Sequence, residues 1–187
     1  NYAGGRPTLD LETIYVMNRK TPGNLYLLNL ENPNDIEQIT QEMTRSNGHS
    51  GLTWTKNGKE IIFVKSEELG SEEIWKIDLE TKEQQQLTFD NEKSIYKVEL
   101  MPDGNSILFG SNRSGSWHIW KVDTDGRNLE QFTDGIVETS PEVTSDGKWL
   151  LYREAFEAPN KLKKRPLEGG ESTLVLENVA VVIKVSP

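Results

Sequence analysis

Short runs of β-branched and aromatic residues recur along the chain, and polar turn residues separate them. Apolar side chains fill positions 61–63 and 74–75, and a similar arrangement returns at 107–109 and 119–120. Runs of this length and composition are typical of half-buried β-strands. Helical periodicity is confined to short polar stretches, so the pattern predicts a protein built from strands.

The turns between the apolar runs repeat at a regular distance. Asn57-Gly58, Asp103-Gly104 and Asp146-Gly147 each stand between two apolar runs, and their glycines are 46 and 43 residues apart. Asn-Gly and Asp-Gly tolerate positive φ, which makes them strong signals for a β-hairpin. Each period of about 45 residues holds four such runs, which matches one blade of a β-propeller.

The phase of the repeat predicts how the blades are completed. The sequence opens with the second, third and fourth strands of a blade, and residues 181–185 restart the pattern of a first strand. Pairing of 181–185 with 12–17 would complete the first blade and remove its exposed edges. We therefore expect an all-β fold: a propeller of four blades, each of four antiparallel strands, closed by its terminal strands. The alternative is a fragment of a larger propeller.

The same alignment gives the expected boundaries. Residues 1–11 are expected to be a leader segment or an edge segment, and residues 12–187 a single β-propeller domain. The approximate blades are 12–41 plus 181–187, 49–89, 95–134 and 139–177.

The third unit resembles a known repeat. It contains Ser-Asn-Arg-Ser-Gly at 111–115, Ile-Trp-Lys-Val-Asp at 119–123, Asp-Gly at 125–126 and Gln-Phe-Thr at 131–133, and Ser-Asp-Gly-Lys follows at 145–148. This order is similar to the TolB-type WD-like propeller repeat. The unit before it lacks the Ser-Asn-Arg element, and the last unit departs from the pattern between Arg153 and Glu171.

The resemblance implies the fold more firmly than the function, because this repeat occurs in many settings. TolB is a periplasmic scaffold of cell-envelope complexes. Similar repeats form the propeller that covers the active site of prolyl oligopeptidase-type peptidases. The resemblance thus implies a periplasmic or extracellular binding or scaffold module, and the alternative is the propeller part of an enzyme, either such a peptidase or a lyase or hydrolase acting in the channel.

Charge and composition narrow the partners. The 187 residues carry 21 Lys and Arg against 30 Asp and Glu, a formal net charge of −9. Nucleic acids and anionic membranes require a basic surface, so neither is expected as a partner. No apolar run approaches the length of a transmembrane helix, so no membrane insertion is expected. A protein or peptide partner remains, and the sequence leaves the oligomeric state open.

The search for reactive groups predicts no catalytic residue, metal or cofactor. The sequence has no cysteine and only two histidines, His49 in a Gly-rich loop and His118 on a strand between apolar residues. Two histidines on different repeats do not make a zinc site. The nucleophile elbow Gly-x-Ser-x-Gly is absent, and Asp123-Thr-Asp125-Gly126 lacks the later ligands of a calcium loop.

The irregular loops are therefore the expected binding region. In a propeller the loops from fourth to first strands share one face with those between second and third strands, and such loops commonly carry function. The candidate residues on them are Arg19, Arg45, His49, Arg113 and Trp117. Arg19 and Arg113 follow equivalent strands, so they either bond carbonyl groups of neighbouring blades or form a basic rim for an acidic ligand.

Overall fold

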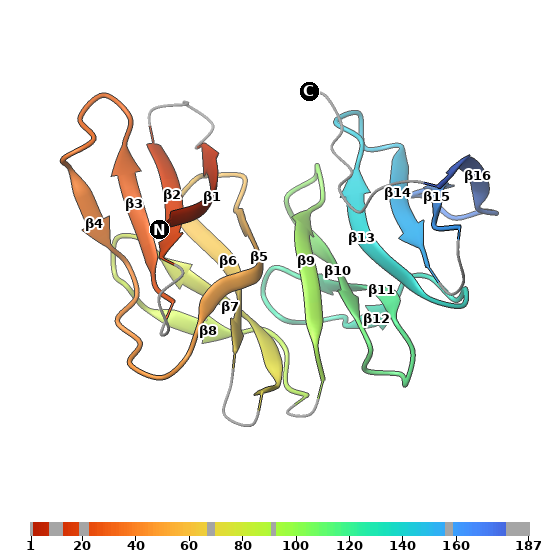
Figure 1. Cartoon of the computed structure of the whole chain (residues 1–187), viewed down its shortest axis with the longest axis horizontal. Helices are drawn as coiled ribbons and strands as arrows, with labels where there is room; N and C mark the ends of the chain where they lie inside the picture. The colour runs from red at the N-terminus through yellow and green to blue at the C-terminus, as the bar shows by residue number, and fades with distance from the viewer. Residues whose placement is uncertain are drawn as a thin grey trace. The chain divides into compact units, whose positions relative to one another are not determined.

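The computed structural model of the chain describes residues 2–7, 13–18, 23–66, 70–90, 93–155 and 159–178, the first two segments through their backbone alone. These residues form strands and loops without an α-helix (Figure 1). The strands are β1 (Tyr2–Pro7), β2 (Thr13–Asn18), β3 (Leu25–Asn29), β4 (Ile36–Gln38), β5 (Asn47–Trp54), β6 (Glu60–Ser66), β7 (Glu72–Asp78), β8 (Gln84–Gln86), β9 (Ile95–Leu100), β10 (Ser106–Ser111), β11 (His118–Asp123), β12 (Glu130–Gln131), β13 (Glu138–Val143), β14 (Trp149–Glu154), β15 (Lys161–Pro166) and β16 (Thr173–Glu177).

The strands form four antiparallel sheets of four strands each. Every sheet is a meander in which strands that follow one another in the sequence are hydrogen-bonded neighbours: β1 to β4, β5 to β8, β9 to β12 and β13 to β16. The predicted all-β fold with four four-stranded sheets is therefore confirmed.

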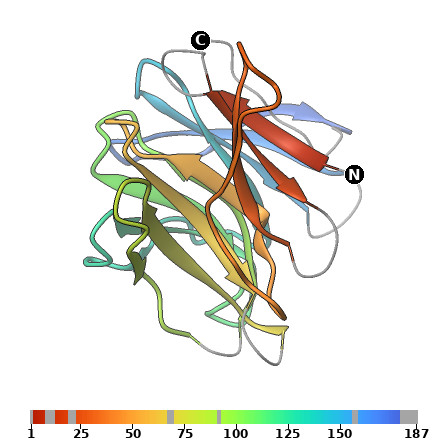
Figure 2. The ribbon, with the colours of Figure 1, turned by 90° about the vertical axis from the view of Figure 1, so that its left-hand side faces the viewer.

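The chain divides into two compact units, Asn1–Glu92 and Lys93–Pro187, each holding two of the sheets. Figure 2 shows the strands of both units from a second direction. The first unit has an apolar core made by Leu25 and Ile39 together with Leu52, Ile61 and Phe63 from the second sheet. The second unit has an equivalent core of Leu108, Ile119, Val143, Leu150 and Tyr152. In each unit, neighbouring sheets thus exclude water by stacking their apolar faces.

The predicted hairpin turns connect the first and second strands of three sheets. The φ angles of Gly58, Gly104 and Gly147 are 70°, 79° and 69°. This left-handed conformation is readily adopted by glycine because it has no Cβ. The Gly147 amide donates to the Thr144 carbonyl at 2.8 Å, closing the turn between β13 and β14.

Each first strand contains a register shift. In β13 the shift lies between Thr139 and Glu142, and Ser140 has a φ of 59°. A bulge re-aims the side chains on one side of it relative to the other. Glu138, just before the shift, and Val143, just after it, are consequently both buried.

The first sheet corrects the predicted ring closure. Strand β2 pairs with β1 on one edge and with β3 on the other, so the predicted pairing of 181–185 with 12–17 is wrong. Residues 181–185 themselves lie outside the described residues. Within the segment of residues 1–11 that was expected to be a leader or an edge segment, residues 2–7 form β1 at an edge of the first sheet. Pairing of two segments joined by a short connection costs much less chain entropy than pairing of the distant chain ends.

Candidate functional site

The predicted binding residues lie in two separate segments of the described chain. Arg45 is partly buried in the loop before β5, and His49 is exposed on β5 itself. Arg113 and Trp117 are both partly buried in the loop between β10 and β11. Arg19 lies outside the residues whose side chains are described.

Arg113 is held against its own sheet. Its guanidinium carbon lies 5.1 Å from the ring centroid of Phe109 and 5.2 Å from that of Trp120. Its Nε donates to the Ser111 hydroxyl at 3.2 Å. A guanidinium that lies over aromatic rings is stabilised by cation–π attraction, so these contacts fix the arginine in the loop.

A repeated threonine follows the fourth strand in three sheets. Its hydroxyl accepts the backbone N–H at or just inside the start of the third strand: Leu25 N to Thr40 Oγ1 at 2.9 Å, Ile74 N to Thr88 Oγ1 at 2.9 Å, and Ile119 N to Thr133 Oγ1 at 3.0 Å. This contact anchors the loop that leads to the next sheet.

The residue before each of these N–H donors provides a second anchor in the first two sheets. Asn24 Oδ1 accepts the Thr40 hydroxyl at 3.0 Å and the Glu42 amide at 2.8 Å. Glu73 accepts the Thr88 hydroxyl at 2.5 Å and also the Asp90 amide. In each of these two sheets, one buried side chain with an oxygen acceptor therefore holds the loop.

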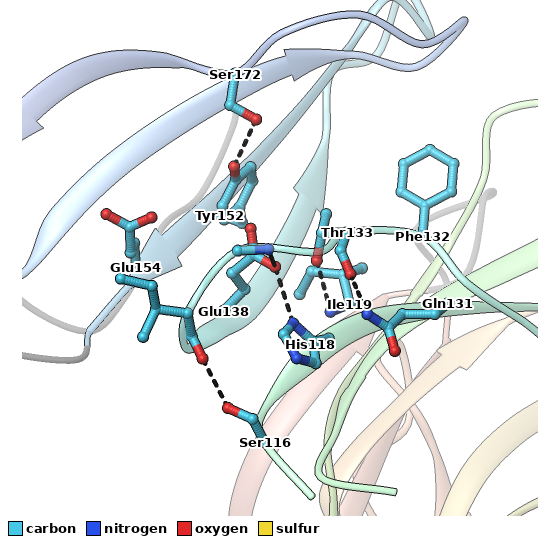
Figure 3. A network of polar contacts seen from close by, with 12 residues as sticks. Ser116, His118, Ile119, Gln131, Phe132, Thr133, Glu138, Tyr152, Glu154 and Ser172 are labelled. Carbon is cyan, nitrogen blue, oxygen red and sulfur yellow. Dashed lines mark hydrogen bonds and ion pairs between the residues drawn. The ribbon is translucent and has the colours of Figure 1, made fainter. Parts of the chain in front are cut away.

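The third sheet has a histidine at this position, and its loop amide is accepted by a different residue. The Gly135 amide, two residues after Thr133, donates to Glu138 Oε2 at 3.0 Å, and His118 Nδ1 lies 3.2 Å from the same oxygen (Figure 3). Glu138 comes from the first strand of the fourth sheet. The loop anchor is thus divided between two sheets and includes an imidazole.

Gly135 permits this close approach. A Cβ on this residue would lie 2.7 Å from Glu138 Oε1. Any larger side chain would have to displace the carboxylate from its position between the loop and His118.

Tyr152 extends the polar network in the second unit. Its hydroxyl donates to Ser172 Oγ at 2.7 Å (Figure 3). Burial is the main reason that the pKa of Tyr152 is raised to about 12, and the negative charges of Glu138 and Glu154 add to this effect. Glu154 is paired with Lys163 at 2.5 Å.

Four hydrogen bonds fix the 134–138 loop. Besides the Gly135 contact, Ser116 Oγ donates to the Ile136 carbonyl at 2.6 Å, the Glu138 amide to the Trp117 carbonyl at 2.7 Å, and the Ala155 amide to the Val137 carbonyl at 3.0 Å. The side chain of Ile136 nevertheless remains 56% exposed. The loop therefore presents an apolar side chain from a well-anchored backbone.

The corresponding loops of the other two sheets with this threonine also carry an exposed apolar residue, three positions after the threonine in the first sheet and one position after it in the second. Met43 is 87% exposed and Phe89 is 75% exposed. Each loop also has an acidic residue close to the apolar one. Glu42 and Asp90 are direct neighbours of Met43 and Phe89, and Asp134 is two positions before Ile136. The turns at the opposite ends of these sheets carry less exposed residues, Leu30 at 43% and Leu129 at 42%.

No group of three or more His, Asp or Glu side chains among the described residues is arranged to hold a metal ion. The His118–Glu138 pair can exchange a proton, but the nearby hydroxyls of Ser116 and Tyr152 already donate to Ile136 and Ser172. The part of the chain that is described also has no helix with the length and apolar character needed to cross a membrane.

Sequence reasoning did not single out Glu138, Tyr152 or the exposed loop residues. A signal did exist for the loops: Met43, Phe89 and Ile136 each follow the repeated threonine by one to three positions. No comparable signal links His118 to Glu138, because their contact depends on the stacking of two sheets.

Consecutive four-stranded antiparallel sheets joined by short loops place the chain in the β-propeller class. The chain belongs to the TolB beta propeller domain family, whose profile it matches over residues 10–179. No curated protein sequence matches the chain.

Solved structures agree on the fold. TolB from Acinetobacter baumannii has a TM-score of 0.81 and 21% identity, with 95% of this chain and 44% of that chain covered. A TolB-type structure from Agrobacterium tumefaciens has a TM-score of 0.77 and 19% identity, with 91% and 63% covered. A puromycin-hydrolyzing peptidase from Mycobacterium tuberculosis has a TM-score of 0.76 and 12% identity, with 96% and 29% covered. The chain thus spans less than two thirds of each of these proteins.

Proposed function

We propose that the chain is a non-catalytic binding module that contacts a protein or peptide partner through the loops after the fourth strands. The observation that carries this proposal is the exposure of Met43, Phe89 and Ile136, each on the loop that follows the fourth strand of its sheet. Large apolar side chains exposed on anchored loops are typical contact residues, because burying them against a partner releases ordered water at little cost in chain entropy.

The neighbouring charges indicate the chemistry of the partner. Phe89 and Ile136 have the acidic neighbours Asp90 and Asp134, whereas Glu42 beside Met43 is already paired with Lys65. The whole chain also has a formal net charge of −9. A partner segment with an apolar side chain flanked by lysine or arginine would be steered to such a loop and would bury its apolar residue.

The family membership supports a setting outside the cytoplasm, where TolB-type scaffolds work. It does not by itself assign a partner, because one fold carries many functions. The similarity to a peptidase favours a second candidate function, the propeller part of an enzyme. In that case a peptide that binds the loops would be a substrate on its way to a separate catalytic domain.

The test uses a phage-displayed library of random peptides selected on the purified chain. We expect selected peptides to be rich in apolar and basic residues and to lose binding to the triple variant Met43→Ser, Phe89→Ser, Ile136→Ser. The matched control is Leu30→Ser, Leu129→Ser, which removes exposed apolar residues from the opposite ends of the sheets and should bind like the wild type.

Two results would overturn the proposal: failure to select any peptide above background, or equal binding by the wild type and the triple variant. Mass spectrometry of the selected peptides after incubation separates the two candidate functions. Intact peptides support a binding module, and cleavage by the purified chain would make it an enzyme.

A further inference from the structure

The anchor of the 134–138 loop differs chemically from its counterparts. In the first two sheets the loop is held by Asn24 or Glu73 from the same sheet. In the third sheet the buried Glu138 carboxylate takes the loop amide, and its second contact is the imidazole of His118. Histidine is the side chain whose charge ordinarily changes between about pH 5 and 8.

We propose that the His118–Glu138 pair is a proton-sensitive contact that determines how firmly the 134–138 loop, and with it Ile136, is held. The proposal rests on the proposed function for its biological meaning, since Ile136 is one of the proposed contact residues. The effect of this contact on the loop can be measured without any partner.

The direction of the effect follows from the geometry. When His118 is neutral, a proton on Nδ1 gives a hydrogen bond to a buried carboxylate. When His118 takes up a proton, the same contact becomes an ion pair between groups that are both buried, with side-chain exposures of 10% and 3%. The positive charge adds Coulomb attraction between the imidazole and the carboxylate, which holds Glu138 where it accepts the Gly135 amide. Mild acidification should therefore tighten the loop.

Other charged and titratable groups near the pair do not reverse this direction. Tyr152 on β14 stays neutral in this range because its pKa is raised to about 12. Glu154 on β14 is neutralised by Lys163 on β15. Arg113 opposes proton uptake, but it is bonded to Ser111, the cross-strand partner of His118, whereas Glu138 contacts the imidazole directly.

The experiment measures the hydrogen exchange of the Gly135 amide by NMR between about pH 7.5 and 5.5, corrected for the intrinsic pH dependence of exchange. The histidine ring signals are followed in the same samples. We expect protection of Gly135 to rise about fivefold between these two pH values as the contact becomes an ion pair.

Two variants and a matched control isolate the pair. His118→Asn keeps an N–H donor that can reach Glu138 but cannot change charge, so Gly135 should remain protected without the pH dependence. Glu138→Gln keeps an oxygen acceptor for Gly135 and should lose the dependence as well. His49→Asn removes the other histidine of the sequence, which is exposed, and should behave like the wild type.

Three outcomes would overturn the proposal: a His118 ring that keeps one charge state across this range, protection that does not change with pH, or pH dependence that persists in His118→Asn. A failure of the peptide selection described above would leave these measurements intact. The proposal of a proton-sensitive contact and the proposed binding function can therefore fail separately.

Discussion

The first and third sheets hold the same backbone amide with different chemical groups. In the first sheet, Asn24 accepts the amide two residues after the repeated threonine. In the third sheet, Glu138 accepts it and His118 contacts Glu138. The comparison teaches that the fold requires an acceptor at this place and does not require a charge. A charge there adds a response to pH.

The hairpin turns of the second and fourth sheets repeat this lesson. Asn57 Oδ1 accepts the Thr55 hydroxyl at 2.8 Å and the backbone amide two residues on at 3.0 Å. Asp146 Oδ1 accepts the Thr144 hydroxyl at 2.6 Å and the corresponding amide at 3.1 Å. At both places the first unit has a neutral amide and the second unit a carboxylate. Glu73 is the exception, because it puts a buried carboxylate in the first unit.

The largest expected effect is that of removing a core phenylalanine, and it tests whether the cores of the two units contribute equally to stability. Phe63 and Phe109 are fully buried and pair with Trp75 and Trp120 across their sheets. Replacing either with alanine removes a large side chain from a packed core, so each variant should lose about 3–5 kcal/mol of unfolding free energy. Urea unfolding followed by circular dichroism measures the loss. The control is Phe89→Ala at an exposed position. Losses that differ by more than about 2 kcal/mol would break the comparison.

The next effect concerns the neutral anchor. Asn24→Ala leaves the Thr40 hydroxyl and the Glu42 amide without their acceptor, which should cost about 1–3 kcal/mol. Asn24→Asp keeps the acceptor but loses the amide donor to the Glu42 carbonyl, so only part of this stability should return near neutral pH. Urea unfolding of both variants checks the prediction. Wild-type stability in Asn24→Ala would show that this anchor does not matter to the first unit.

Much of the fold could be predicted from the sequence because its signals are local. The Asn-Gly and Asp-Gly turns require positive φ, and the apolar runs beside them have the length of strands. β1 was missed because its sequence, Tyr-Ala-Gly-Gly-Arg-Pro, has neither alternation nor β-branched residues. It becomes a strand through its pairing with β2, a tertiary effect that outweighs local preference.

The candidate site was less predictable for a related reason. His118 reads as a packed or an outward-facing strand residue, and in the structure it is buried. Its contact with Glu138 requires the register shift in β13 and the stacking of the fourth sheet on the third. Neither leaves a spacing signal in the sequence. The exposed apolar residues on the loops were missed because single apolar residues in polar loops are common.

A smaller effect appears at alkaline pH in the second unit. Tyr152 has a pKa raised to about 12 by burial, whereas a tyrosine in the unfolded chain ionises near pH 10. The unfolded chain therefore releases this proton first, and stability falls as the pH rises from about 10 to 12. Tyr152→Phe should lose about 1 kcal/mol at neutral pH with the Ser172 hydrogen bond and lose less further stability above pH 10.

Ultraviolet absorbance titration of the tyrosines and urea unfolding at two pH values check this. The control is Tyr96→Phe, since Tyr96 is exposed. If Tyr152→Phe and the wild type lose stability equally at high pH, the buried phenol does not contribute to the alkaline response.

The smallest effect sharpens the comparison of the two hairpin turns. The Thr144 hydroxyl is the main reason that the pKa of Asp146 is lowered, and the Lys148 amide adds to it. Because its pKa is lowered, Asp146 stabilises the fold fully at pH values above the ordinary pKa of an aspartate. This contribution is lost as the pH falls through the lowered pKa. Asp146→Asn should match the wild type near neutral pH and be less sensitive to acid. Asn57→Asp should show the reverse change in the first unit. Acid unfolding followed by circular dichroism measures both. A parallel acid response in the wild type and both variants would mean that these turns need only an acceptor, and that their charge has no measurable consequence.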